Sequence, residues 1–220
     1  MRGESLLGYA YSLGSVSGRA SQPWCSAACL AVVGPRTAQR PHPLLVSAGA
    51  SDAGREFAGR HADYVFMPGR TPRDECRRRI ADIRAIAARE GRGEDAVKLQ
   101  MHASVLVRET AAEARAASEE VAAGVELTAV VEYLQTVRRN ISTYDDIYSS
   151  LGTLEMRQIG SVAGARKIHG DPGAVADGLE CLSRDFGCDG VALTFPWWTA
   201  DEVQRFGDLV VPELKRRGLW

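Results

Sequence analysis

The stretch HPLLVSAGASDAGREFAGRHADYVFMPG, residues 42–69, decides the fold of this 220-residue chain. A short apolar run at 44–47 ends in the small residues 47–51, and helical spacing then places Phe57, Ala58, His61 and Ala62 on one face. A second apolar run, 64–67, ends at Pro68-Gly69. This order of strand, helix and strand predicts a unit with two parallel strands.

The same alternation of strand and helix signals continues along the chain. Apolar, β-branched runs at 98–107 and 191–195 predict two more strands. Signals that begin a helix recur between and after them, at Thr71-Pro72, Thr110-x-x-Glu113, Asp171-Pro172 and Thr199-x-x-Glu202. The fold class is therefore α/β, with four parallel strands that we expect to be adjacent and in chain order. Polar residues at about 125–165 interrupt the rhythm and predict a helical or looped insertion.

The first residues differ from the rest of the chain. Residues 1–34 contain one acidic residue, Glu4, and show no helical or alternating period. An acid-poor start is a weak feature of transit and secretory segments, but we favour an irregular lead-in without targeting function. We therefore divide the chain into a lead-in, 1–34, and a domain, 35–220.

Composition narrows the classes of function. The chain is 45% hydrophobic, carries a formal net charge of −1 and mixes its arginines with acids, so we expect neither nucleic acid nor a membrane as a partner. Its five cysteines show no metal-ligand spacing, so we expect neither zinc nor a disulfide framework. A cytoplasmic protein fits this composition.

Three segments together resemble the bacterial luciferase-like flavin monooxygenases, in the branch of the nitrilotriacetate, dibenzothiophene-sulfone, long-chain alkane and pyrimidine monooxygenases. The first is residues 42–58 with Ala62-Asp63-Tyr64-Val65-Phe66, after Gly34-Pro35. The second is residues 170–177, GDPGAVAD. The third runs from CDGVALTF, 188–195, to VVPELKRRG, 210–218.

The resemblance implies a (β/α)8 TIM barrel, a fold that takes about 250 residues. The four strands would correspond to strands five to eight, so this chain resembles the C-terminal half of that barrel. Such a half exposes two unpaired sheet edges, which favours self-association into a homo-oligomer.

The resemblance also implies a function: oxidation of a small organic substrate with O2 by reduced FMN, which a separate flavin reductase supplies, or by a related deazaflavin. Family residues that hold the flavin ring lie mainly on the first four strands, so we expect the isolated chain to be inactive. The alternative is a non-catalytic, truncated homologue that acts as a binding or interaction module.

The turn at 47–51 is the best candidate site. By resemblance, the backbone of Ala50 and the backbone and hydroxyl of Ser51 would hold the flavin phosphate at a helix N-terminus. The alternative is that Ser51 only caps the helix. Trp197-Trp198 would either wall a pocket or cap the barrel rim. The four histidines show no catalytic or metal-ligand spacing. No catalytic residue is assigned.

Overall fold

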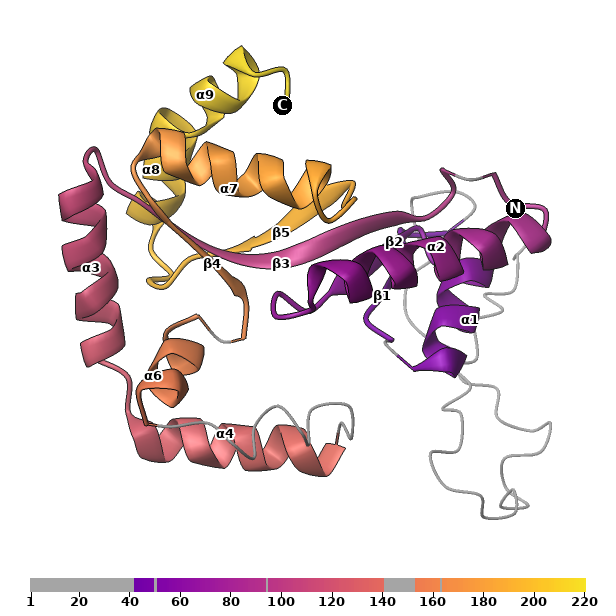
Figure 1. Ribbon diagram of the computed structural model, residues 1–220, viewed down its shortest axis with the longest axis horizontal. Helices are drawn as coiled ribbons and strands as arrows, with labels where there is room; N and C mark the ends of the chain where they lie inside the picture. The colour runs from indigo at the N-terminus through magenta and orange to yellow at the C-terminus, as the bar shows by residue number, and fades with distance from the viewer. Residues whose placement is uncertain (1–41, 50, 94, 141–152, 163) are drawn as a thin grey trace, which may run out of the picture. The chain divides into compact units, whose positions relative to one another are not determined.

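The computed structural model describes residues 42–49, 51–93, 95–140, 153–162 and 164–220, of which those from Leu45 onward belong to one compact unit (Figure 1). The lead-in lies outside the described residues. The helices and strands are β1 (Val46–Ser47), α1 (Asp52–His61), β2 (Tyr64–Met67), α2 (Arg73–Arg89), β3 (Lys98–Val107), α3 (Ala111–Ala123), α4 (Leu127–Asn140), α6 (Thr153–Ser161), β4 (Arg166–Gly170), α7 (Pro172–Arg184), β5 (Gly190–Thr194), α8 (Ala200–Leu209) and α9 (Val211–Arg216).

The four expected strands form one parallel sheet in the expected order. β1 pairs with β2, β2 with the first half of β3, and β5 with residues 100–104 of β3, all in parallel. β3 is the long central strand of this sheet (Figure 1). The α/β class and the adjacency of these four strands are therefore confirmed.

A fifth strand, β4, was not expected from the sequence. It pairs in parallel with residues 103–107 of β3, whereas β2 pairs with residues 98–101. β5 pairs with residues 100–104 of β3, a range that overlaps the residues paired with β2 and those paired with β4. Because a strand has only two edges, β5 must lie along one edge of β3, and β2 and β4 lie one after the other along the opposite edge. The β4 sequence, RKIHG, is short and polar, so its pattern predicts no strand.

Gly69 lies where β2 ends and β4 begins. A Cβ atom at this position would overlap the backbone nitrogen of Arg166 and the carbonyl oxygen of His102. Only glycine lets the two backbones approach so closely, so Gly69 permits the shared edge.

Most helix starts follow their sequence signals. Thr110 and Glu113 form the predicted capping box of α3, and the Asp171 carboxylate accepts from Ala174 N (2.9 Å) at the start of α7. α8 begins after Thr199 as expected, but Thr199 makes no side-chain cap bond, and the carboxylate of Glu202 binds Arg108 and Arg205 instead of completing a capping box.

The predicted apolar face of α1 is only partly right. Ala58 and Ala62 are buried, but Phe57 is 53% exposed and stacks on His61. Gly59 packs closely against the Ile86 side chain of α2, so the contact between the two helices forms at Gly59 and leaves Phe57 outside it.

Alternate residues of the strands point to the two faces of the sheet. Leu99, Met101 and Ala103 point to the face that α7 and α8 cover, and all three are completely buried. We call this the covered face, and its side chains form most of the hydrophobic core. The second face, as defined by strand register, carries Tyr64, Phe66, Lys98, Gln100, His102, Ser104, Leu106, Lys167, His169, Ala192 and Thr194.

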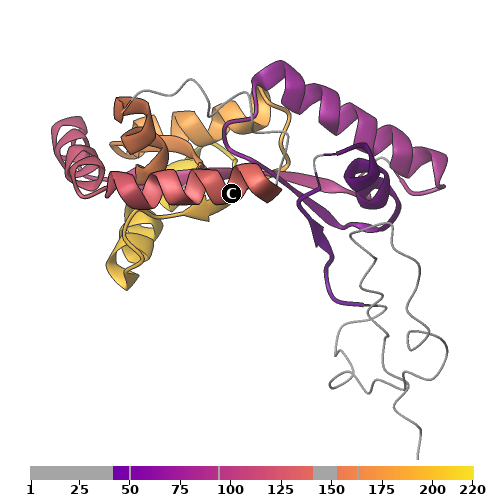
Figure 2. The same ribbon diagram turned by 90° about the horizontal axis from the view of Figure 1, so that it is seen from below.

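The insertion is helical where the structure describes it. α4 packs against α6 (Figure 1, Figure 2) through Val130 and Ile159, which form a small separate hydrophobic cluster. None of the described helices combines the length and apolar character that crossing a membrane requires.

Candidate functional site

The turn between β1 and α1 has the geometry of a helix cap. Ser51 adopts an extended backbone, and its hydroxyl accepts from Gly54 N at 3.2 Å. The Ser51 carbonyl accepts from Arg55 N (2.8 Å), which begins the helical hydrogen bonding. Ala50, the other residue predicted to hold phosphate, lies outside the described residues. The cap leaves the Ser51 O–H hydrogen available as a donor to a ligand.

Two glycines pack this turn against its own helix. A Cβ at Gly49 would lie 2.7 Å from Gly54 Cα, closer than side-chain carbons approach a backbone. The Ser47 hydroxyl accepts from Gly49 N at 3.4 Å and holds the other side of the turn. This packing is specific to glycine and brings the loop backbone onto the first turn of α1.

A carboxylate lies beside the same helix start. Asp52 is almost fully exposed in the first turn of α1 and pairs with Arg55 at 2.6 Å, and Arg55 also lies 3.7 Å from Asp82. Asp52 already complements the positive end of the helix dipole. An anion bound at this turn would therefore meet one negative and one positive side chain.

His102 lies on the second face, close to the ends of β2 and β5. Thr194 Oγ1 lies 3.3 Å from His102 Nε2, and the Phe66 ring lies 5.2 Å from the imidazole. Burial lowers the pKa of His102, so the ring is neutral at pH 7. The sequence showed no partner for this histidine, because Phe66 and Thr194 belong to other strands.

A second polar cluster lies where β3 ends. The Arg108 guanidinium forms a two-point contact with Glu202 (2.9 and 3.0 Å), and Arg205 also donates to Glu202 at 2.9 Å. Glu202 is buried, and the Arg108 guanidinium lies 5.5 Å from the Trp197 ring centroid. This network joins the start of α8 to the end of β3.

His169 and the tryptophans complete this end of the sheet. His169 Nδ1 lies 3.0 Å from Ser118 Oγ, and burial, with smaller effects of Lys167 and Arg108, lowers the pKa of His169 to about 4. Trp197 packs on a cluster of Leu106, Ala114 and Ala117, whereas Trp198 is 82% exposed. Trp197 was predicted either to wall a pocket or to cap the barrel rim, and this packing fits the second role.

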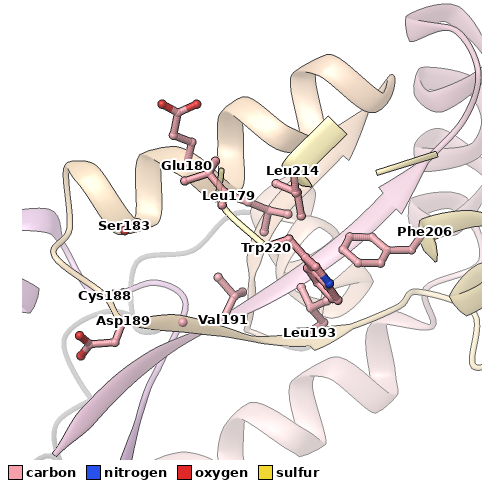
Figure 3. Close-up of a pocket in the computed structure, with 12 residues that line it drawn as sticks. Leu179, Glu180, Ser183, Cys188, Asp189, Val191, Leu193, Phe206, Leu214 and Trp220 are labelled. Carbon is pink, nitrogen blue, oxygen red and sulfur yellow. The ribbon is translucent and has the colours of Figure 1, made fainter. Parts of the chain in front are cut away.

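A hollow of about 260 Å³ lies elsewhere, between α7, α8, α9, β5 and the C-terminal residues (Figure 3). Leu179, Val191, Leu193 and Phe206 line it, with Trp220 over one side (Figure 3). Val191 and Leu193 belong to the covered face, so this hollow is separate from the turn at Ser51 and from the second face.

Comparison with known proteins decides the family. The model of the luciferase-like monooxygenase family matches residues 25–189. The chain belongs to this family. Nitrilotriacetate monooxygenase component A of Aminobacter aminovorans is 27% identical over 86% of this chain and 48% of its own length. The FMNH2-dependent dimethylsulfone monooxygenase of Pseudomonas putida is 38% identical over 44% of this chain and 25% of its own.

The structural comparison agrees with this luciferase-like family. The crystal structure of a long-chain alkane monooxygenase superposes with a TM-score of 0.66 at 29% identity and covers 81% of this chain and 42% of the other. The expected resemblance and the partial TIM-barrel fold are therefore confirmed. The chain spans about half the length of the curated relatives that it matches across most of its sequence.

Proposed function

We propose that this chain forms one half of a flavin-dependent monooxygenase barrel that uses reduced FMN and O2 to oxidise a small organic substrate. The remaining strands would come from other residues, of a longer chain or of a separate one. The family match over residues 25–189 carries this proposal. The name of the dimethylsulfone monooxygenase supports FMNH2 as the cofactor rather than a deazaflavin.

We place the phosphate of FMN at Ala50 and Ser51. The glycine-packed turn fits an anion, because it leads into the first turn of α1, where backbone N–H groups lack helical partners. The Ser51 hydroxyl would donate to a phosphate oxygen while it continues to accept from Gly54 N. The bound flavin would supply the reaction with oxygen, and these residues would only hold and orient it.

The partners follow from the same proposal. A separate flavin reductase would supply the reduced cofactor in the cytoplasm, and the second face would line the barrel interior once the other strands cover it. Homo-oligomers would arise through the strand edges that one half leaves unpaired.

Substitution of Ser51 by alanine tests the phosphate site. Loss of a hydrogen bond to a charged phosphate costs about 1.5–3 kcal/mol, or roughly 10- to 100-fold in the Kd for FMN. Loss of a cap costs about 1 kcal/mol of folding stability. We therefore expect Ser51→Ala to weaken FMN binding, measured by fluorescence titration of the chain joined to a complementary half barrel.

Thr110→Ala is the matched control, because it removes a cap hydroxyl from α3, away from the proposed site. It should lower the melting temperature without changing the Kd for FMN. If the Ser51→Ala variant and the unchanged protein bind FMN with equal affinity, Ser51 only caps α1 and does not hold the phosphate.

A binding module without catalysis is the second candidate. Phe66, Gln100 and His102 on the second face are only partly buried by the described residues, as expected of a surface that receives a partner. Oxygen consumption with FMN, a reductase and the complementary half separates the two functions. Substrate-dependent oxygen uptake supports the enzyme, and tight association without such uptake supports the module.

A further inference from the structure

Two thiols from distant parts of the sequence lie together in the core. Cys76 lies in the first turn of α2 and Cys188 just before β5, 112 positions later, yet their sulfur atoms are 3.9 Å apart. Both cysteines are free and buried. A disulfide needs a sulfur separation of about 2.05 Å, so a movement of about 2 Å would bring the two atoms to bonding distance.

The backbone holds both residues in place. Cys76 N donates to Pro72 O (2.8 Å) within α2, and Cys188 N donates to Leu182 O (3.1 Å) at the end of α7. Asp189 N donates to Leu99 O (2.8 Å) and anchors the next residue to β3. The two sulfur atoms therefore face each other across well-fixed elements, so side-chain rotation must provide most of the closure.

Two arginines, Arg166 and Arg79, act on the Cys76 thiol. The Arg166 guanidinium lies 4.4 Å from the Phe186 ring centroid and donates to Thr71 O (3.1 Å), and within the described part of the chain it has no carboxylate partner. A hydrogen bond with Cys188, together with the charges of Arg166 and Arg79, lowers the pKa of the Cys76 thiol. Thiolates are the reactive form of cysteine, so Cys76 is the more reactive member of the pair.

Cys181 offers a contrast nearby. Its thiol donates to the carboxylate of Asp185 at 3.3 Å, and burial and this hydrogen bond raise its pKa. A thiol beside a carboxylate stays protonated and reacts slowly. The charge pattern thus favours Cys76 over Cys181.

A hollow lies beside one member of the pair. Cys188 lines the hollow of about 260 Å³ that lies against α7 and β5 (Figure 3). Cys76 itself has no exposed surface and lies 3.9 Å from the Cys188 sulfur, so peroxide must pass Cys188 to reach it. Hydrogen peroxide is small and neutral, so it is suited to enter such a space.

We propose that Cys76 and Cys188 form a reversible, peroxide-sensitive disulfide. The Cys76 thiolate attacks one oxygen of hydrogen peroxide, the O–O bond breaks, and after uptake of one proton the products are a Cys76 sulfenic acid and water. The Cys188 sulfur then attacks the Cys76 sulfur, and the hydroxyl leaves as a second water with the Cys188 proton. The two thiols lose two electrons and the peroxide gains them. This chemistry does not depend on the proposed monooxygenase function.

The bond would tie the first turn of α2 to the start of β5. It would close a loop of about 110 residues and so restrict the unfolded chain strongly. We expect the melting temperature of the oxidised protein to rise by about 5–10 °C relative to the reduced protein.

Peptide mapping of the folded 220-residue chain tests the proposal. The chain is treated with graded hydrogen peroxide, remaining thiols are alkylated, and the protein is digested with trypsin without reductant. Arg77 follows Cys76 and Arg184 separates Cys181 from Cys188, so Cys76, Cys181 and Cys188 fall on different peptides. We expect a peptide pair joined through Cys76 and Cys188 that dithiothreitol releases.

Two variants sharpen the result. Cys181→Ser should leave the crosslink intact, whereas Cys188→Ala should abolish it and leave a Cys76 sulfenic acid that dimedone captures. The proposal is overturned if Cys76 and Cys188 stay reduced in the folded protein while the urea-unfolded chain oxidises, or if Cys76 crosslinks to another cysteine instead.

Discussion

Leu99, Met101 and Ala103 point to the covered face of β3 and are completely buried, whereas Gln100 and His102, which alternate with them, point to the second face and are half-buried. One strand thus serves two purposes. The covered face is apolar and supplies the core, and the second face carries amide, imidazole and hydroxyl groups from three strands. The comparison teaches that alternation along a central strand separates an apolar side, which builds the core, from a side that carries polar groups.

The largest expected difference between the faces is in stability. Leu99→Ala leaves a cavity in the core and should lower the free energy of unfolding by about 3 kcal/mol. Gln100→Ala, one residue away on the second face, should change it by about 0.5 kcal/mol or less. Urea unfolding followed by circular dichroism measures both, and equal losses would contradict the division into two faces.

The second expected difference is in pH dependence. The pKa of His169, on the second face, falls from an ordinary 6.5 to about 4, so between these values the unfolded chain binds the proton and the folded protein does not. Stability should therefore fall as the pH drops, by about 1–2 kcal/mol between pH 7 and pH 5 from this residue.

Replacement of His169 by glutamine isolates this effect. The variant should lose less stability than the unchanged protein when urea unfolding is compared at pH 7 and pH 5. If both proteins lose the same amount, His169 does not titrate as its burial indicates.

The smallest expected effect concerns His102. Burial lowers its pKa, and the Phe66 ring at 5.2 Å supplies part of that burial. Phe66→Ala should therefore raise the pKa of His102 toward its ordinary value. Titration of the imidazole signals by NMR measures the change, and His61→Gln, which lies on α1, serves as the control that should leave it unaltered.

Much of the fold follows from local patterns. The capping box at Thr110 and Glu113 and the Asp171-Pro172 start are confirmed, because such signals act within one helical turn. β4 was missed because its five residues, RKIHG, carry no apolar alternation and become a strand only beside β3. The phosphate site at Ala50 and Ser51 remains a prediction. The sequence did not indicate the close packing of Gly49 on Gly54 beside it, which only the structure shows.

The sequence by itself determined four of the five described strands, most helix starts and the family, because periodicity, caps and family segments are properties of neighbouring residues. Only the tertiary structure decided which distant residues meet. It placed β2 and β4 on one edge of β3, directed Glu202 to Arg108 rather than to a cap, and brought Cys76 to 3.9 Å from Cys188. These contacts join positions tens of residues apart, and they depend on strand register and core packing, which local patterns do not encode.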